Sequence, residues 1–93
     1  MEREEIDGLL VMQLQEVLAL DTPPALDARL SEDLRADSLD LVEVIEGVER
    51  ALAVRDVTVR LDDDALRAIT TVGDAADALR RAVRDAPKGG VRR

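Results

Sequence analysis

Apolar residues recur at three- and four-residue steps along much of the chain, which is the spacing of one face of an α-helix. The first such segment runs from about Glu4 to Leu20. Its apolar positions are Ile6, Leu9, Leu10, Leu14, Val17 and Leu18. Pro23 and Pro24 follow shortly, and proline lacks a backbone donor and disfavours helical backbone before it. The pattern therefore predicts a first helix that ends before Asp21.

A loop is predicted from Asp21 to Ala36. Loops of this length are usually functional or disordered. Leucines nevertheless recur through this one at four-residue intervals, as Leu26, Leu30 and Leu34. We expect these three side chains to hold the loop on the core.

A second helix is predicted from Ser38 to about Leu52. Asp37 is a preferred N-cap residue, and Asp40 can close a capping box with it. The apolar positions that share one face of this helix are Leu41, Val44, Ile45, Val48 and Leu52. That face is expected to pack against the core.

The segment from Ala53 to Leu61 alternates apolar with polar residues, which is a strand pattern. Every other segment is helix or loop, so a strand here would have no partner, and we interpret the segment as an extended connection. Asp62-Asp63-Asp64 can cap a short third helix that ends near Ala68. These acids lack the Asp-x-Asp-x-Asp-Gly spacing of a calcium loop, so we interpret them as a cap.

Thr71 and Asp74 form a second capping box, at the start of a fourth helix that ends before Pro87. Its inward positions are Val72, Ala75, Ala76, Leu79 and Val83. The sequence thus predicts an all-α fold, a small four-helix bundle of three main helices and one short helix. We expect residues 1–86 to form one domain and the polar residues 87–93 to be a disordered tail.

The composition of the 93 residues excludes several classes of protein. Phe, Trp and Tyr are absent, so no aromatic platform can stack nucleic-acid bases. The net charge of -8 repels phosphate backbones and anionic membranes and favours partners with basic patches. Cys and His are also absent, which rules out disulfides and thiolate metal sites and removes the commonest general base.

Targeting signals are not evident in the sequence. No apolar run approaches the ~20 residues of a membrane span. The acidic start Met1-Glu2-Arg3-Glu4-Glu5 lacks the order of a signal peptide. We therefore expect a cytoplasmic monomer that binds neither nucleic acid, membrane nor metal.

Ser38 falls at the first position of the second helix, where its hydroxyl projects outward beside free backbone N–H groups. These donors and the helix dipole favour a phosphate. No base that could activate Ser38 as a nucleophile is available in the sequence. We interpret Ser38 as an attachment point and the protein as non-catalytic.

The run Asp37-Ser38-Leu39-Asp40, between Glu32-Asp33-Leu34 and Val42-Glu43, resembles the modification site of acyl carrier proteins. The resemblance covers nearly the whole chain and includes Ile69-Thr70-Thr71-Val72. It implies that a phosphopantetheinyl transferase moves 4′-phosphopantetheine from coenzyme A onto Ser38, beside the cap residue Asp37. Acyl groups are then carried as thioesters on the terminal thiol, in polyketide, fatty-acid or related biosynthesis. The implied partners are that transferase and acyltransferase, ketosynthase or acyl-ligase enzymes with basic docking patches.

The second helix carries five acids and no basic residue between Asp37 and Glu49. Like charges three or four positions apart each destabilise a helix by about 0.2–0.5 kcal/mol, so folding alone favours mixed signs. In acyl carrier proteins this helix docks on partner enzymes. The resemblance carries that role to Leu39, Asp40, Val42, Glu43, Glu46 and Glu49.

Several positions depart from the family pattern, among them Leu52, where an aromatic is frequent, and the segment 55–59, which is similar to a short insertion. Arg35 stands where a glycine often precedes the motif, which places a positive charge near the prosthetic phosphate. Glu46 stands where fatty-acid carriers are commonly apolar, which favours a freestanding carrier of specialised metabolism. Two alternatives stay open. One is a peptidyl or aminoacyl carrier, whose motif usually has Gly-Gly, and the other is an acidic helical adaptor without a prosthetic group.

Overall fold

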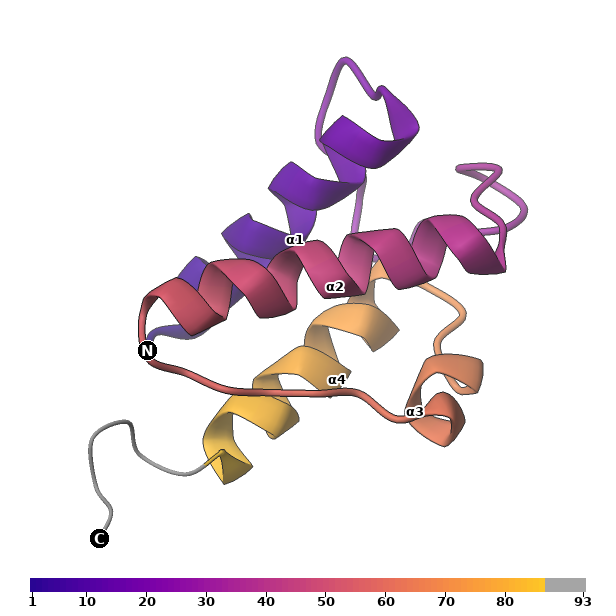
Figure 1. Ribbon diagram of the computed structural model, residues 1–93. Coiled ribbons are helices and arrows are strands. Elements are labelled where there is room, and N and C mark those ends of the chain that lie inside the picture. Colours follow the sequence, from indigo (N-terminus) through magenta and orange to yellow (C-terminus); the bar gives the residue numbers. More distant parts are fainter. Residues whose placement is uncertain (87–93) are drawn as a thin grey trace, which may run out of the picture.

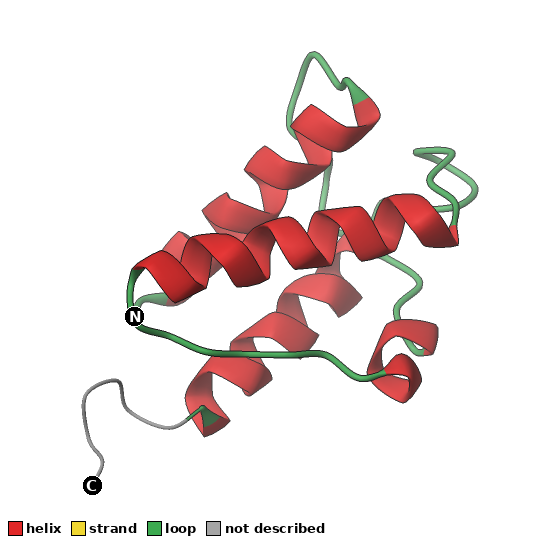
Figure 2. Ribbon diagram, viewed as in Figure 1, coloured by secondary structure: helices red, strands yellow, loops and turns green. Residues whose placement is uncertain are grey.

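The computed structural model describes residues 1–86, which form four helices and the loops that connect them (Figure 1; Figure 2). The helices are α1 (Arg3–Leu18), α2 (Ser38–Val54), α3 (Asp63–Arg67) and α4 (Val72–Asp85). No strand occurs within these residues, so the predicted fold of three main helices and one short helix is confirmed. The disorder predicted for residues 87–93 lies outside the described residues.

The helices enclose a core that is aliphatic throughout. Helix α1 packs against both α2 and α4. The largest side chains that are less than 2% exposed are Leu10, Leu14, Val44, Ile45, Val48, Leu52, Val72 and Leu79. Full burial of each such side chain contributes about 1.5–3 kcal/mol. Most of the inward positions predicted from the spacing of apolar residues therefore form the core, and Leu41 and Val83 lie half-buried at its edge.

The loop between α1 and α2 is held differently from the prediction. Leu30 is buried and Leu34 packs partly against the core, but Leu26 is 53% exposed, so the predicted anchoring role of its side chain is wrong. The backbone anchors the loop there instead. The Leu26 carbonyl accepts a hydrogen bond from the Gly73 N–H at 2.7 Å, and the Ala28 carbonyl accepts one from the Val72 N–H at 3.0 Å. These bonds also satisfy two donors at the start of α4, which have no partner within the helix.

The connection between α2 and α3 is extended and unpaired, as predicted. Helix α2 runs to Val54, two residues past the predicted end, and this valine is 87% exposed. Val59 is buried and packs into the core. The connection runs back beneath α2, so that α3 lies near the N-terminal half of α2 (Figure 1).

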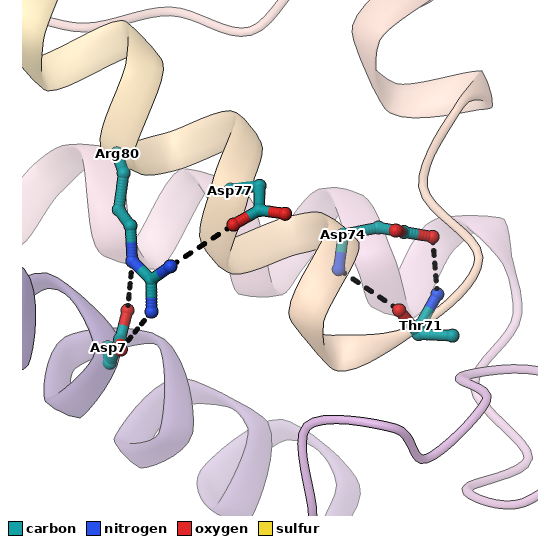
Figure 3. A network of polar contacts seen from close by, with 5 residues as sticks. All are labelled: Asp7, Thr71, Asp74, Asp77 and Arg80. Carbon is teal, nitrogen blue, oxygen red and sulfur yellow. Dashed lines mark hydrogen bonds and ion pairs between the residues drawn. The ribbon is translucent and has the colours of Figure 1, made fainter.

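Helix α4 begins at the predicted capping box (Figure 3). The Thr71 hydroxyl accepts a hydrogen bond from the Asp74 N–H, and the Asp74 carboxylate accepts bonds from the Thr70 and Thr71 N–H groups, all at 3.0 Å. The backbone donors of Thr71 and Thr70 lower the pKa of Asp74. The start of α4 is therefore fixed by local hydrogen bonds, which is why the sequence could predict it.

Candidate functional site

Ser38 is exposed at the first position of α2, and a capping box holds the backbone on either side of it. The Asp37 carboxylate accepts a hydrogen bond from the Asp40 N–H at 2.8 Å, and the Asp40 carboxylate accepts one from the Asp37 N–H at 3.1 Å. The Leu41 N–H donates to the Asp37 carbonyl at 3.0 Å. The amides of Ser38 and Leu39 have no carbonyl to pair with inside the helix. The predicted cap is confirmed, and it presents the serine hydroxyl beside two free donors.

A groove of about 410 Å³ opens beside Ser38. It lies between the loop, the start of α2 and the α3 region, and Leu30, Leu41, Leu66 and Ile69 line its apolar part. Ser38 itself is exposed, and no hydrogen bond of its hydroxyl is found within residues 1–86. An exposed hydroxyl at a helix N-terminus fits a phosphodiester, because free amides and the helix dipole stabilise negative charge there.

The turn before Asp37 has a left-handed backbone at Arg35, with φ at 60°. Ala36 is buried, and its N–H donates to the Leu30 carbonyl at 2.8 Å. Arg35 is exposed, so its guanidinium extends from the surface close to the start of α2. The backbone conformation is one that glycine adopts without a Cβ clash.

The predicted docking residues fall into two groups. Leu39 is 74% exposed, and it lies with Val42, Glu43 and Glu46 at three- and four-residue steps, on one outer face of α2. We call these four residues the outer face of α2. Asp40 closes the capping box and is half-buried.

Glu49 has a role that the sequence does not reveal. Its carboxylate accepts a hydrogen bond from the Leu61 N–H at 3.1 Å and so ties the extended connection to α2. Leu61 lies twelve residues away, and the contact depends on the path of the connection.

Within residues 1–86, no group of three or more acids is placed to hold a metal ion, and no helix is long and apolar enough to cross a membrane.

Comparison with known protein families shows to which family the chain with this serine site belongs. A family described as the phosphopantetheine attachment site matches residues 9–79, which include Ser38. The chain belongs to this family. The matched span runs from within α1 into α4, so the whole bundle and not only the serine motif carries the likeness.

Several acyl carrier proteins are similar to this chain over most of its length. The chain is 35% identical over 80 residues to the acyl carrier protein of Thermotoga maritima, covering 85% of this chain and 93% of that one. It is 39% identical over 85 residues to the acyl carrier protein of Rubrobacter xylanophilus, and the match covers 83% of this chain and 90% of that one. It is 33% identical over 81 residues to that of Acidothermus cellulolyticus, covering 86% and 90%.

These findings confirm the resemblance to acyl carrier proteins and the predicted cofactor, a covalently attached 4′-phosphopantetheine. Acyl carrier proteins are carriers and not catalysts. As members of this family they interact with a phosphopantetheinyl transferase and with biosynthetic enzymes.

Proposed function

We propose that Ser38 carries the 4′-phosphopantetheine and that the protein holds acyl groups for biosynthetic enzymes. The observation that carries the proposal is the exposed serine hydroxyl at the first position of α2, inside the capping box of Asp37 and Asp40. Ser31 is the other serine of the chain, and it lies in the loop.

The residues around Ser38 position the group and take no part in thioester chemistry. When bound, 4′-phosphopantetheine supplies a terminal thiol on which acyl groups are held as thioesters. The capping box fixes the first turn, and the amides of Ser38 and Leu39 are available to donate to a phosphate oxygen. A serine on a rigid helix start keeps the root of the arm fixed, and the arm raises the effective concentration of its cargo at each partner.

The test is intact mass after incubation with coenzyme A and a broad-specificity phosphopantetheinyl transferase. We expect wild type and Ser31→Ala to gain one phosphopantetheine and Ser38→Ala to gain none while remaining folded by circular dichroism. The proposal is contradicted if the Ser38→Ala variant is still modified. It is also contradicted if the wild-type protein is not modified by any of several transferases. The second outcome would favour an acidic adaptor without a prosthetic group.

We also propose that the outer face of α2 docks on basic patches of partner enzymes. Its acids, Glu43 and Glu46, are exposed and make no ion pair within residues 1–86, and the apolar Leu39 and Val42 lie beside them on the same face. Charge complementarity of this kind acts mainly on the rate of association. Asp40 and Glu49 contribute to the same acidic field while holding the cap and the connection.

Glu43→Lys is the sharpest test of this docking face, because the side chain has no structural partner within residues 1–86. We expect it to slow phosphopantetheine transfer to Ser38 about tenfold at low salt, with the loss shrinking as salt is added. Glu16→Lys, an exposed position on α1, is the matched control with the same charge change. Equal slowing by both variants would mean that net charge alone matters and that α2 is not the docking surface.

For the pathway, we propose a carrier of polyketide or other specialised biosynthesis rather than a fatty-acid carrier. The exposed Glu46 supports this, since that position is commonly apolar in fatty-acid carriers. In a reconstituted fatty-acid synthase we expect the modified protein to support slow elongation and Glu46→Leu to be several-fold faster. If the wild-type protein supports elongation as fast as Glu46→Leu does, the result would count against a specialised role.

A further inference from the structure

At the end of the molecule opposite Ser38, several arginines gather around one groove. A groove of about 690 Å³ lies between the start of α1, the turn after α2 and the C-terminal half of α4. The chain has a net charge of -8, yet the walls of this groove carry Arg3, Arg55, Arg80, Arg81 and Arg84. Two acids, Asp56 and Asp77, also line it, so arginines outnumber acids among its lining residues.

Two of these arginines are held in place by ion pairs. Arg80 donates from Nε to Asp7 of α1 at 3.0 Å, pairs a second time with the same carboxylate, and reaches Asp77 at 3.1 Å (Figure 3). Arg55 pairs with Glu5 at 3.1 Å. These contacts join α1 to α4 and to the turn after α2, and so they set the shape of the groove.

The remaining arginines are available to a ligand. Arg3 and Arg81 are exposed and make no ion pair within residues 1–86, and Arg84 makes only a long contact of 3.5 Å with its neighbour Asp85. The floor between them is apolar, with Val57 and Val83 half-buried there. Guanidinium groups beside an apolar floor suit a partner that offers both carboxylates and apolar side chains.

We propose that this groove is a second docking surface and that it binds an acidic segment of a partner protein, with apolar residues between its carboxylates. The groove lies at the C-terminal end of α2, about 25 Å from Ser38 along this 17-residue helix (Figure 1). A partner bound there leaves Ser38 and the outer face of α2 free for a second protein.

Other occupants fit less well. The chain's own residues 87–93 contain Lys88, Arg92 and Arg93 and no acidic side chain. An anionic membrane is flat, whereas the basic residues line a concave surface, and the net charge of -8 repels such a membrane. The exposed arginines without a close ion pair, Arg3, Arg81 and Arg84, therefore favour a narrow acidic segment.

The test measures binding of a short fluorescein-labelled peptide of Glu and Leu to the full chain by fluorescence anisotropy. We expect saturable binding that weakens about tenfold in Arg3→Glu/Arg81→Glu. The matched control is Arg50→Glu/Arg60→Glu, which makes the same charge change at exposed positions outside the groove, and it should weaken binding much less. A peptide with Gln in place of Glu should not bind, and one with Ser in place of Leu should bind less tightly.

Several results would overturn the proposal. Absence of binding to wild type, or equal weakening by the two double variants, would show that the groove does not recognise the peptide. Vesicles of phosphatidylglycerol and phosphatidylcholine that bind wild type and not Arg3→Glu/Arg81→Glu would assign the groove to a lipid surface. A dimer in sedimentation velocity that the same variant loses would assign it to a second copy of the chain. Modification of Ser38 is independent of all these outcomes, so the two proposals fail separately.

Discussion

Three residues that are not glycine hold left-handed backbone within residues 1–86: Ala19 at φ 56°, Arg35 at 60° and Asp56 at 64°. Ala and Arg do not mark such a conformation in a sequence, since glycine is the usual occupant, and Asp adopts it more readily than they do. At Arg35 the surroundings impose it, because Ala36 is buried and bonded to the Leu30 carbonyl. The Asp37 cap, by contrast, depends on residues three apart, and so Ser38 could be placed from the sequence.

Arg35 gives a prediction at this scale. A Cβ atom in the left-handed region costs about 1–2 kcal/mol, and the extra backbone entropy of glycine offsets about 0.5–1 kcal/mol of the gain. We expect Arg35→Gly to raise the free energy of unfolding by about 0.5–1 kcal/mol in urea denaturation. Arg35→Ala removes the same guanidinium and keeps the Cβ, so it should change little. Equal effects of the two variants would show that the charge, and not the backbone, is responsible.

At the level of elements, the helix starts were predictable and some of the packing was not. Thr71 and Asp74 close a local capping box, and Asp62 caps α3 through the Ala65 N–H. The side chain of Leu26 was expected on the core, but its backbone carbonyl makes the anchoring contact. Helical spacing of leucines does not distinguish a buried side chain from an exposed one when the loop is held by its backbone.

The contact between α4 and α1 gives a second prediction. Arg80 and Asp7 are 73 positions apart, and their side chains are only 22% and 26% exposed. Asp7 raises the pKa of Arg80 through its hydrogen bonds. We expect Arg80→Gln to lower the free energy of unfolding by about 1–2 kcal/mol, because a partly buried, doubly bonded charge pair is lost.

The same substitution at Arg67 is the control. Arg67 pairs with Asp64 at 2.8 Å, but these side chains are 72% and 92% exposed. Exposed pairs contribute about 0–1 kcal/mol, so Arg67→Gln should fall at the low end of that range. If thermal and urea unfolding give the same loss for both variants, the Arg80 pair does not hold α4 on α1.

Across the whole molecule, charge is distributed unevenly. Six of the thirteen basic residues lie between Arg80 and Arg93, a stretch whose one acid is Asp85, while α2 carries acids from Asp40 to Glu49. The fold class followed from helical periodicity and from the absence of a partner for the one strand-like segment. The groove lined by arginines could not be predicted from the sequence. It gathers residues from α1, from the turn after α2 and from α4, and only the tertiary fold brings these together.

The account rests on Ser38 as the carrier residue, and peptide mapping tests this most directly. Trypsin cleaves after Arg35 and Arg50, and the fragment 36–50 contains Ser38 as its only hydroxyl side chain. Ser31 falls in the separate fragment 30–35. After treatment with coenzyme A and transferase, we predict that the whole phosphopantetheine mass appears on fragment 36–50. The same mass on fragment 30–35, or on a fragment that contains threonine, would contradict the account.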